Sequence, residues 1–172
     1  MVTGDFMFTI RDYNKNDAEK ILSWITDEKS FRQWSADKYK TYPATADDMN
    51  SFYDGISKEG AKQFVFCEDG KAIGHFVLRP DPDGDAHSAR LGFIVVDSSI
   101  RGKGYGKTML LKALELVFDT LGKRRVTLGV FENNPKALKC YQSIGFTQWS
   151  ESVCVINDEA WKCLEMECLK RE

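Results

Sequence analysis

The sequence is short of the residues that build metal centres and disulfide frameworks. Its 172 residues include two histidines and five cysteines without a CxxC pair, namely Cys67, Cys140, Cys154, Cys163 and Cys168. An odd number of scattered cysteines favours neither a zinc site nor a complete set of disulfides. We therefore expect reduced thiols, as in the cytoplasm, and no metal.

Long apolar runs and an excess of one charge are also missing. The N-terminal segment 1–6 lacks the basic start and apolar core of a signal peptide, and no stretch is long enough for a membrane span. The 24 basic and 26 acidic residues are interspersed, so there is no basic stripe of the kind that binds nucleic acid. These absences predict a cytoplasmic protein without membrane or nucleic-acid partners, and the length predicts one domain over residues 5–171.

Glycine is concentrated in one segment, Arg101-Gly102-Lys103-Gly104-Tyr105-Gly106. The apolar run 91–96 before it predicts a buried strand, and the helical spacing of apolar residues over 108–121 predicts a largely buried helix after it. Glycines let a ligand approach the backbone closely, and the first N–H groups of a helix have no partner within it. With the basic side chains of the segment and of Lys107, this is a candidate anion-binding loop.

Two well-known phosphate loops do not fit these glycines. The GxxxxGK[ST] loop matches Gly106-Lys107-Thr108 but requires glycine at Arg101, and the GxGxxG fingerprint requires glycine at Lys107 or at Met109. A tight strand-to-helix turn, whose glycines serve only its geometry and whose basic side chains are solvated, is the alternative interpretation.

The first half of the chain predicts an edge strand, two helices and a hairpin. Apolar alternation indicates the strand over 6–11, and cap residues at 14–17 and at Thr45 with Asp48 indicate the helices. The aromatic stretch 31–43 between the helices is predicted to be irregular and to fold over a pocket. The Asp69-Gly70 turn predicts a hairpin of strands 63–67 and 72–78, which pairs with strand 89–96.

The second half predicts a mixed sheet. A crossover through the helix 108–121 makes strand 126–130 parallel to strand 91–96. Two further antiparallel strands are expected over 146–155 and 160–169.

Arg101, Gly104 and Gly106 spell RxxGxG, and residues 134–146 spell NxxAxxxYxxxGF. Both motifs resemble those of the GNAT superfamily of acyl-CoA-dependent N-acetyltransferases, and the order of elements is similar over nearly the whole chain. The resemblance implies an α/β (α+β) fold with a mixed, mostly antiparallel seven-stranded sheet. About four helices flank this sheet, and its two central parallel strands splay apart.

The resemblance also implies how acetyl-CoA binds. Pantetheine would lie in the opening between the parallel strands, and the pyrophosphate would lie on the main-chain N–H groups of Gly102 to Lys107. The implied coenzyme-binding residues are Ile94, Val95, Val96, Arg101, Gly102, Lys103, Gly104, Tyr105, Gly106, Lys107 and Asn134. Asn134 also fits a purely structural role, because it is a favourable N-cap before Pro135.

The chemistry requires proton transfers. A lysine-like amine has a pKa of about 10.4, so a base or a water path must remove a proton before it can attack a thioester. The departing thiolate needs an acid, and by resemblance Tyr141 is that acid. A main-chain N–H of the segment 94–96 would stabilise the charge that develops on the thioester oxygen. Cys140 adjoins Tyr141 but faces another direction on a helix, so an acyl-cysteine intermediate is not predicted.

The base is less well defined. Some family members carry an acidic residue on the strand after the glycine loop, but the comparable position here is Gly129. Glu132, His75 and Asp97 are the alternatives, acting through water, and we predict Glu132. Their structural interpretations are a helix-flanking carboxylate, a histidine satisfied within the sheet and a turn residue, respectively.

Together these patterns predict an N-acetyltransferase that uses acetyl-CoA directly in a ternary complex, with a peptide N-terminus or a small-molecule amine as acceptor. The apolar positions of the first helix, with Trp24 and Trp34, are most similar to the branch that includes ribosomal-protein N-terminal acetyltransferases and many small-molecule acetyltransferases. A non-catalytic acyl-CoA-binding or sensor domain is the alternative from another class. A homodimer is a family-level expectation.

Overall fold

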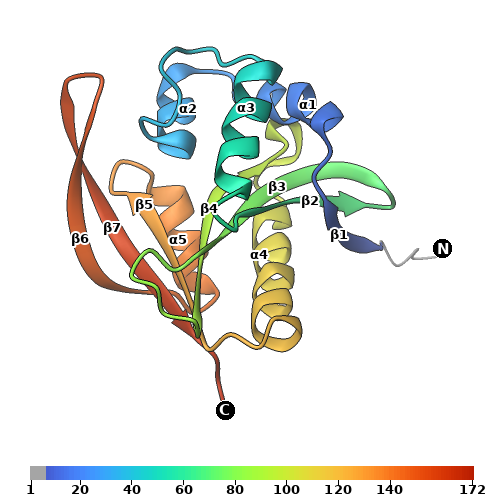
Figure 1. Cartoon of the computed structure of the whole chain (residues 1–172), viewed down its shortest axis with the longest axis vertical. Helices are drawn as coiled ribbons and strands as arrows, with labels where there is room; N and C mark the ends of the chain where they lie inside the picture. Colours follow the sequence, from blue (N-terminus) through green and yellow to red (C-terminus); the bar gives the residue numbers. More distant parts are fainter. Residues whose placement is uncertain (1–6) are drawn as a thin grey trace.

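One sheet with helices on both faces organises the chain in its computed structural model, which describes residues 7–172 (Figure 1). The strands are β1 (Phe8–Asp12), β2 (Lys62–Glu68), β3 (Lys71–Pro80), β4 (Ser88–Val96), β5 (Arg125–Phe131), β6 (Thr147–Ile156) and β7 (Glu159–Leu169). The helices are α1 (Ala18–Ser23), α2 (Glu28–Ser35), α3 (Ala46–Ser57), α4 (Tyr105–Glu115) and α5 (Pro135–Ser143). Short 3-10 turns, η1 (Lys15–Asp17) and η2 (Ser98–Ile100), and a π-helical turn, η3 (Leu116–Thr120), complete the described elements.

The sheet has seven strands in the order β1-β2-β3-β4-β5-β7-β6. Strands β4 and β5 are parallel, and all the other neighbours are antiparallel. The mixed, mostly antiparallel sheet predicted from the sequence is therefore confirmed.

Apolar side chains form a layer on each face of the sheet. One layer packs α4 and α5 against the sheet, with Met109 and Leu110 fully buried. The other layer packs α1, α2 and α3 against the opposite face through Ile21, Phe31 and Met49. Figure 1 shows these three helices gathered at the top of the drawing, with the tip of the β6–β7 hairpin at the same height.

Several local signals predicted their elements correctly. Asn14 caps the first helical turn, and Thr45 and Asp48 form the expected capping box of α3. Asp69 and Gly70 adopt positive φ angles of 49° and 82°, as a two-residue hairpin turn requires. The edge strand β1 begins at Phe8, and Phe6, where it was predicted to begin, lies outside the described residues.

The prediction that the stretch 31–43 is irregular was wrong for its first part, and only its second half is irregular. Phe31 and Trp34 belong to the helix α2, which Asp27 caps by accepting a hydrogen bond from the Ser30 N–H at 2.8 Å. Eight residues are too few for a helical apolar period to stand out, and burial of Phe31 stabilises the helix instead. Because of α2, residues 7–172 contain five α-helices rather than about four.

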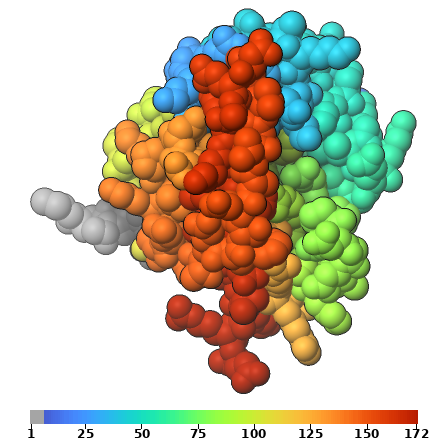
Figure 2. Space-filling view, turned by 90° about the vertical axis from the view of Figure 1, so that its left-hand side faces the viewer, coloured from blue at the N-terminus to red at the C-terminus, as the bar shows by residue number. Residues whose placement is uncertain are grey.

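The β6–β7 hairpin extends from the sheet to α2. Figure 2 shows it as a ridge that runs up the molecule to the blue and cyan segments at the top. At its tip, the side-chain amide of Asn157 donates to a carboxylate oxygen of Glu28 at 3.2 Å.

No helix within residues 7–172 is long and apolar enough to cross a membrane. That part of the chain also contains no group of three or more His, Cys, Asp and Glu residues that could hold a metal ion.

Candidate active site

The parallel strands β4 and β5 stay together over only three residue pairs. Pairing begins at Ser88 with Arg125 and ends at Arg90 with Thr127, although both strands continue beyond that point. The later parts of the two strands therefore have main-chain groups that do not bond across the β4–β5 boundary. This is the splayed opening that the sequence resemblance implied.

A β-bulge interrupts β4 at this opening. His75 pairs with Val95 and Val77 pairs with Gly92, so two residues of β4, Phe93 and Ile94, oppose a single residue of β3. Phe93 has a φ angle of 50°, which is unusual for a non-glycine residue. The extra residue reverses the alternation of side chains, so Phe93 packs on the α1–α3 side of the sheet and Ile94 on the α4–α5 side.

The glycine loop follows β4 and leads directly into α4. Gly102 and Gly104 have φ angles of 81° and 84°, and a Cβ atom on either would meet nothing within 4 Å. Gly104 is the N-cap of α4, and no side chain caps the helix there. The N–H groups of the first helical turn are therefore left without a side-chain acceptor, while Lys103 and Lys107 are exposed beside them. These features fit an anion such as a diphosphate.

Two side chains of the loop have structural partners. Arg101 donates to the main-chain oxygens of Val96 at 3.3 Å and Trp24 at 3.2 Å, which ties the loop to the end of α1. The hydroxyl of Tyr105 donates to the Glu68 carboxylate at 3.1 Å and connects the start of α4 to β2. Arg101 and Tyr105 therefore shape the loop through their side chains, and sequence reasoning had assigned them only to the coenzyme.

The second motif forms α5, on the same side of the sheet as α4. Asn134 is the N-cap and accepts from the Ala137 N–H, and Gly145 follows the helix with a φ angle of 107°. Tyr141 is 8% exposed, and its hydroxyl forms no hydrogen bond with any of residues 7–172. Burial raises the pKa of Tyr141 well above its ordinary value, so this side chain is a neutral hydroxyl over the physiological pH range.

The predicted bases lie in different environments. Glu132 is exposed at the end of β5, where one carboxylate oxygen lies 3.7 Å from the Lys162 ammonium. His75 is fully buried between the Tyr53 hydroxyl at 2.6 Å and the Phe64 carbonyl at 2.8 Å, and burial lowers its pKa to about 4. Asp97 accepts from the Ser99 main chain in a turn. For His75 and Asp97 the structure thus shows the sheet and turn roles that were the alternatives.

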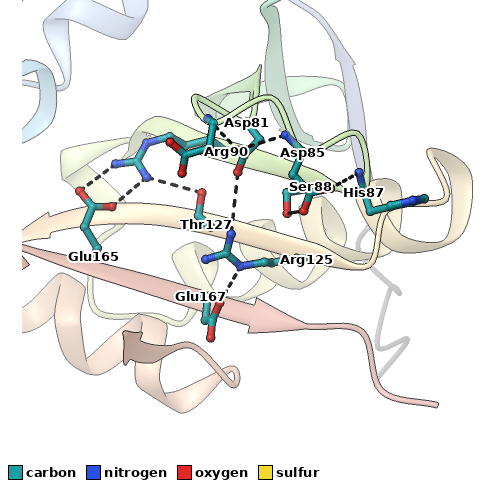
Figure 3. Close-up of polar contacts among 10 residues, drawn as sticks. Asp81, Asp85, His87, Ser88, Arg90, Arg125, Thr127, Glu165 and Glu167 are labelled. Carbon is teal, nitrogen blue, oxygen red and sulfur yellow. Dashed lines mark hydrogen bonds and ion pairs between the residues drawn. The ribbon is translucent and has the colours of Figure 1, made fainter. Parts of the chain in front are cut away.

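A carboxylate that sequence reasoning missed lies beside Gly129. Gly129 pairs with Glu165 of β7, and a Cβ atom on Gly129 would lie 3.5 Å from a Glu165 oxygen. Glu165 forms a two-point ion pair with Arg90 at 2.8 and 3.2 Å, and Arg90 also contacts Thr127 (Figure 3). A carboxylate of the neighbouring strand β7 thus lies beside the position where β5 has none. Only the pairing of β5 with β7 reveals it.

Aromatic side chains form a wall on the α1–α3 face beside the bulge. The Phe93 ring lies 5.4 Å from the Trp34 ring and 5.5 Å from the Phe52 ring, and Trp34 stacks on Tyr39 at 6.0 Å. Gln33 connects α2 to the β5–α5 loop by donating to the main-chain oxygen of Asn133 at 3.0 Å. Next to this contact, a cavity of about 370 Å³ lies between α2, that loop and the tip of the β6–β7 hairpin. It is lined not by the aromatic wall but by Glu28, Lys29, Arg32, Asn133, Ile156, Asn157, Glu159 and Trp161.

Comparison with known proteins decides the family. The profile of the Acetyltransferase (GNAT) family matches residues 20–146, which include the splayed strands, the glycine loop and α5. The chain belongs to this family. The resemblance that the two motifs carried is thereby confirmed.

Individual relatives match either about half of the chain or most of it at lower identity. An L-amino acid N-acetyltransferase of Escherichia coli (strain K12) is 33% identical over 93 residues, which cover 52% of this chain and 55% of that protein. A spermidine N(1)-acetyltransferase of Vibrio cholerae is 21% identical over 140 residues, covering 81% of this chain and 79% of that protein. The chain spans only 29% to 47% of the length of three other curated acetyltransferases that it matches.

A solved structure extends the likeness to the whole GNAT fold. The spermidine N-acetyltransferase from Vibrio cholerae in complex with CoA and spermine has a TM-score of 0.78 and 23% identity, covering 94% of this chain and 95% of that one. These relatives are named for L-amino acids and spermidine, and the likeness to the ribosomal-protein branch finds no support among them.

Proposed function

We propose that the chain transfers an acetyl group from acetyl-CoA to a primary amine of a small molecule, by direct attack within a ternary complex. The observation that supports this most is the junction of β4 with α4. There β4, which no longer pairs with β5, leads through the glycine loop into α4. The N-cap of α4 is a glycine with a φ angle of 84°, so no side chain accepts from the first N–H groups of the helix. Family membership adds the expectation that the ligand at this junction is acyl-CoA.

Acetyl-CoA supplies the activated acetyl group, and the chain's part is to hold it. The main-chain N–H groups of residues 102–107 bind the diphosphate, with Lys103 and Lys107 adding positive charge. The main chain of Ile94, Val95 and Val96 faces the opening between β4 and β5 and binds the pantetheine arm. Asn134 holds the start of α5 beside this opening.

Two proton transfers complete the reaction. Glu132 accepts the proton that the attacking amine loses, through water, because its exposed carboxylate lies at the end of β5. Tyr141 donates a proton to the departing sulfur. Its raised pKa suits an acid that must remain protonated until that moment, and its hydroxyl has no acceptor among residues 7–172 to hold the proton back.

The acceptor is a small-molecule amine in this proposal, because the relatives are named for L-amino acids and spermidine. A peptide N-terminus remains the alternative acceptor. We further propose that residues 5–171 act as one domain in the cytoplasm and that the protein forms a homodimer, which analytical ultracentrifugation would test.

The activity is tested by incubating the chain with acetyl-CoA and a panel of amines and measuring free thiol. The panel contains amino acids, polyamines and peptides with a free N-terminus. Turnover with at least one amine is expected, and Tyr141→Phe should lower kcat by roughly 10²–10⁴-fold while CoA affinity stays unchanged. Tight binding of acetyl-CoA without acetylation of any amine would instead favour the acyl-CoA sensor.

A further inference from the structure

Several buried side chains carry hydrogen-bond donors that have no acceptor. Within residues 7–172, four buried side-chain atoms lack a hydrogen-bond partner, and they are Arg32 Nε, Trp34 Nε1, Tyr39 Oη and Arg79 Nε. All four can donate a hydrogen bond, and leaving such a group buried and unsatisfied costs about 1–3 kcal/mol. An unsatisfied donor of this kind at the edge of a cavity is suited to a ligand that brings acceptor oxygens.

Two of the side chains that carry these donors, Arg79 and Trp34, contact Phe93 at the bulge of β4, and Tyr39 packs behind Trp34. The guanidinium of Arg79 lies 5.7 Å from the centre of the Phe93 ring, and the Trp34 ring lies 5.4 Å from it. Tyr39 stacks on Trp34 with an interplanar angle of 5°. Arg32 differs, because it donates to the main-chain oxygen of Tyr39 at 2.7 Å and so stabilises the turn after α2.

Unlike its neighbours Arg90 and Arg125, Arg79 has no anionic partner among residues 7–172. Arg90 pairs with Glu165, and Arg125 pairs with Glu167 at 2.6 Å, as Figure 3 shows. No hydrogen bond or ion pair joins Arg79 to any of residues 7–172. Burial, followed by the nearby charge of Arg90, lowers the pKa of Arg79, and the Glu165 carboxylate, which is paired with Arg90, offsets this only in part.

The position of Arg79 places this charge beside the bulge of β4, just before the segment 94–96 that is proposed to bind pantetheine. Its terminal nitrogen would lie 3.3 Å from a Cβ atom on Gly92, the residue just before the bulge. A cavity of about 250 Å³ adjoins it, lined by Ile56, Glu59, Ala61, Arg79, Pro80, Pro82 and Arg90. Of the two guanidinium groups in this lining, Arg90 is already paired with Glu165, so Arg79 is the one left for a carboxylate.

From these contacts we infer that the acceptor carries a carboxylate close to its reacting amine, as an amino acid does, and that Arg79 binds this carboxylate. A guanidinium can bind a carboxylate through two parallel hydrogen bonds, which fixes the orientation of the amine as well as its position. The inference rests on the proposed function and specifies the substrate class of that site.

The test compares acceptors that differ only in the carboxylate. Rates of thiol release are measured for the common L-amino acids, for their primary carboxamides and for spermidine. We expect kcat/KM to be at least tenfold higher for the preferred amino acid than for its carboxamide. Arg79→Gln should lower kcat/KM for that amino acid by roughly 10–100-fold, mainly through KM, while leaving the carboxamide and the KM for acetyl-CoA unchanged.

Matched variants separate recognition from folding. Arg79→Lys keeps the charge but loses the planar fork, so it should retain part of the preference for the carboxylate. Arg124→Gln removes an exposed arginine and should leave kcat/KM unchanged for both the amino acid and its carboxamide. If Arg79→Gln is poorly folded, Arg79→Lys alone carries the comparison.

Two outcomes would overturn the inference while leaving the proposed function intact. One is acetylation of spermidine or of carboxamides at rates equal to or above those of every amino acid. The other is an equal loss of kcat/KM for acids and carboxamides in the Arg79 variants. The absence of turnover with any amine would instead refute the proposed function itself.

Discussion

Replacing Gly104 by alanine tests the coenzyme loop most directly. Gly104 has a φ angle of 84°, and a Cβ atom there would meet nothing within 4 Å, so Gly104→Ala introduces backbone strain without a clash. An L-residue in this left-handed conformation costs about 1–2 kcal/mol. In a domain of this size, 1 kcal/mol lowers Tm by about 2–4 °C, so we expect a fall of roughly 2–8 °C.

Gly84 offers a control with nearly the same backbone. Its φ angle is 79°, and a Cβ atom there would also meet nothing within 4 Å. It lies in the connection between β3 and β4, whereas the glycine loop follows the other end of β4. Gly84→Ala should therefore lower Tm by a similar amount without touching the coenzyme.

Binding of CoA, measured by titration calorimetry, then separates the two variants. The methyl group of Gly104→Ala occupies the open space above the N–H groups that would bind the diphosphate. We expect Kd for CoA to rise at least tenfold, about 1.4 kcal/mol, in Gly104→Ala and to stay within twofold of the wild type in Gly84→Ala. Equal Kd values in the two variants, at comparable losses of Tm, would refute the assignment of the loop to the coenzyme.

Three further changes have defined outcomes. Burial lowers the pKa of His75 from 6.5 to about 4, so between these values the unfolded chain binds a proton that the folded chain does not. The free energy of unfolding should therefore fall by roughly 3 kcal/mol as the pH drops through this window. Measured by urea denaturation, its dependence on pH should be flatter for His75→Gln, and the same dependence in both proteins would contradict this. Thr45→Ala removes the N-cap of α3 and should cost about 1 kcal/mol, seen as a Tm lower by about 2–4 °C, whereas exposed Thr41→Ala should leave Tm unchanged. Glu132→Gln should lower kcat by roughly 10²-fold or more if Glu132 is the base, while Glu151→Gln, which removes the other carboxylate near Lys162, should not; equal rates would exclude Glu132.

Local chemistry made much of the fold predictable. The Asp69-Gly70 turn, the capping box of α3 and the helix start at Asn134 each depend on a few neighbouring residues, and the structure has all three. The glycine loop is likewise a local signal, because its positive φ angles are accessible mainly to glycine. The parallel pairing of β4 with β5 followed from the direction that a crossover helix imposes.

Features that depend on pairing across the sheet were not predictable in this way. Glu165 reaches the space beside Gly129 because β7 pairs with β5 in one particular register. The lack of an ionic partner for Arg79 follows from the pairing of Arg90 with Glu165 and of Arg125 with Glu167. A sequence shows which residues are charged, but only the register shows which charges neutralise one another.

The bulge at Phe93 explains why the sites for the coenzyme and the acceptor cannot be understood separately. Its φ angle of 50° costs about 1–2 kcal/mol, and burial of the ring, which leaves Phe93 only 6% exposed, contributes about 1.5–3 kcal/mol in return. That burial depends on Trp34 of α2 and Phe52 of α3, which lie far away in the sequence. The same bulge turns Ile94 toward the α4–α5 layer, where it packs beside the strand opening. A change in the aromatic wall that alters acceptor binding would therefore also shift the main chain proposed to bind pantetheine.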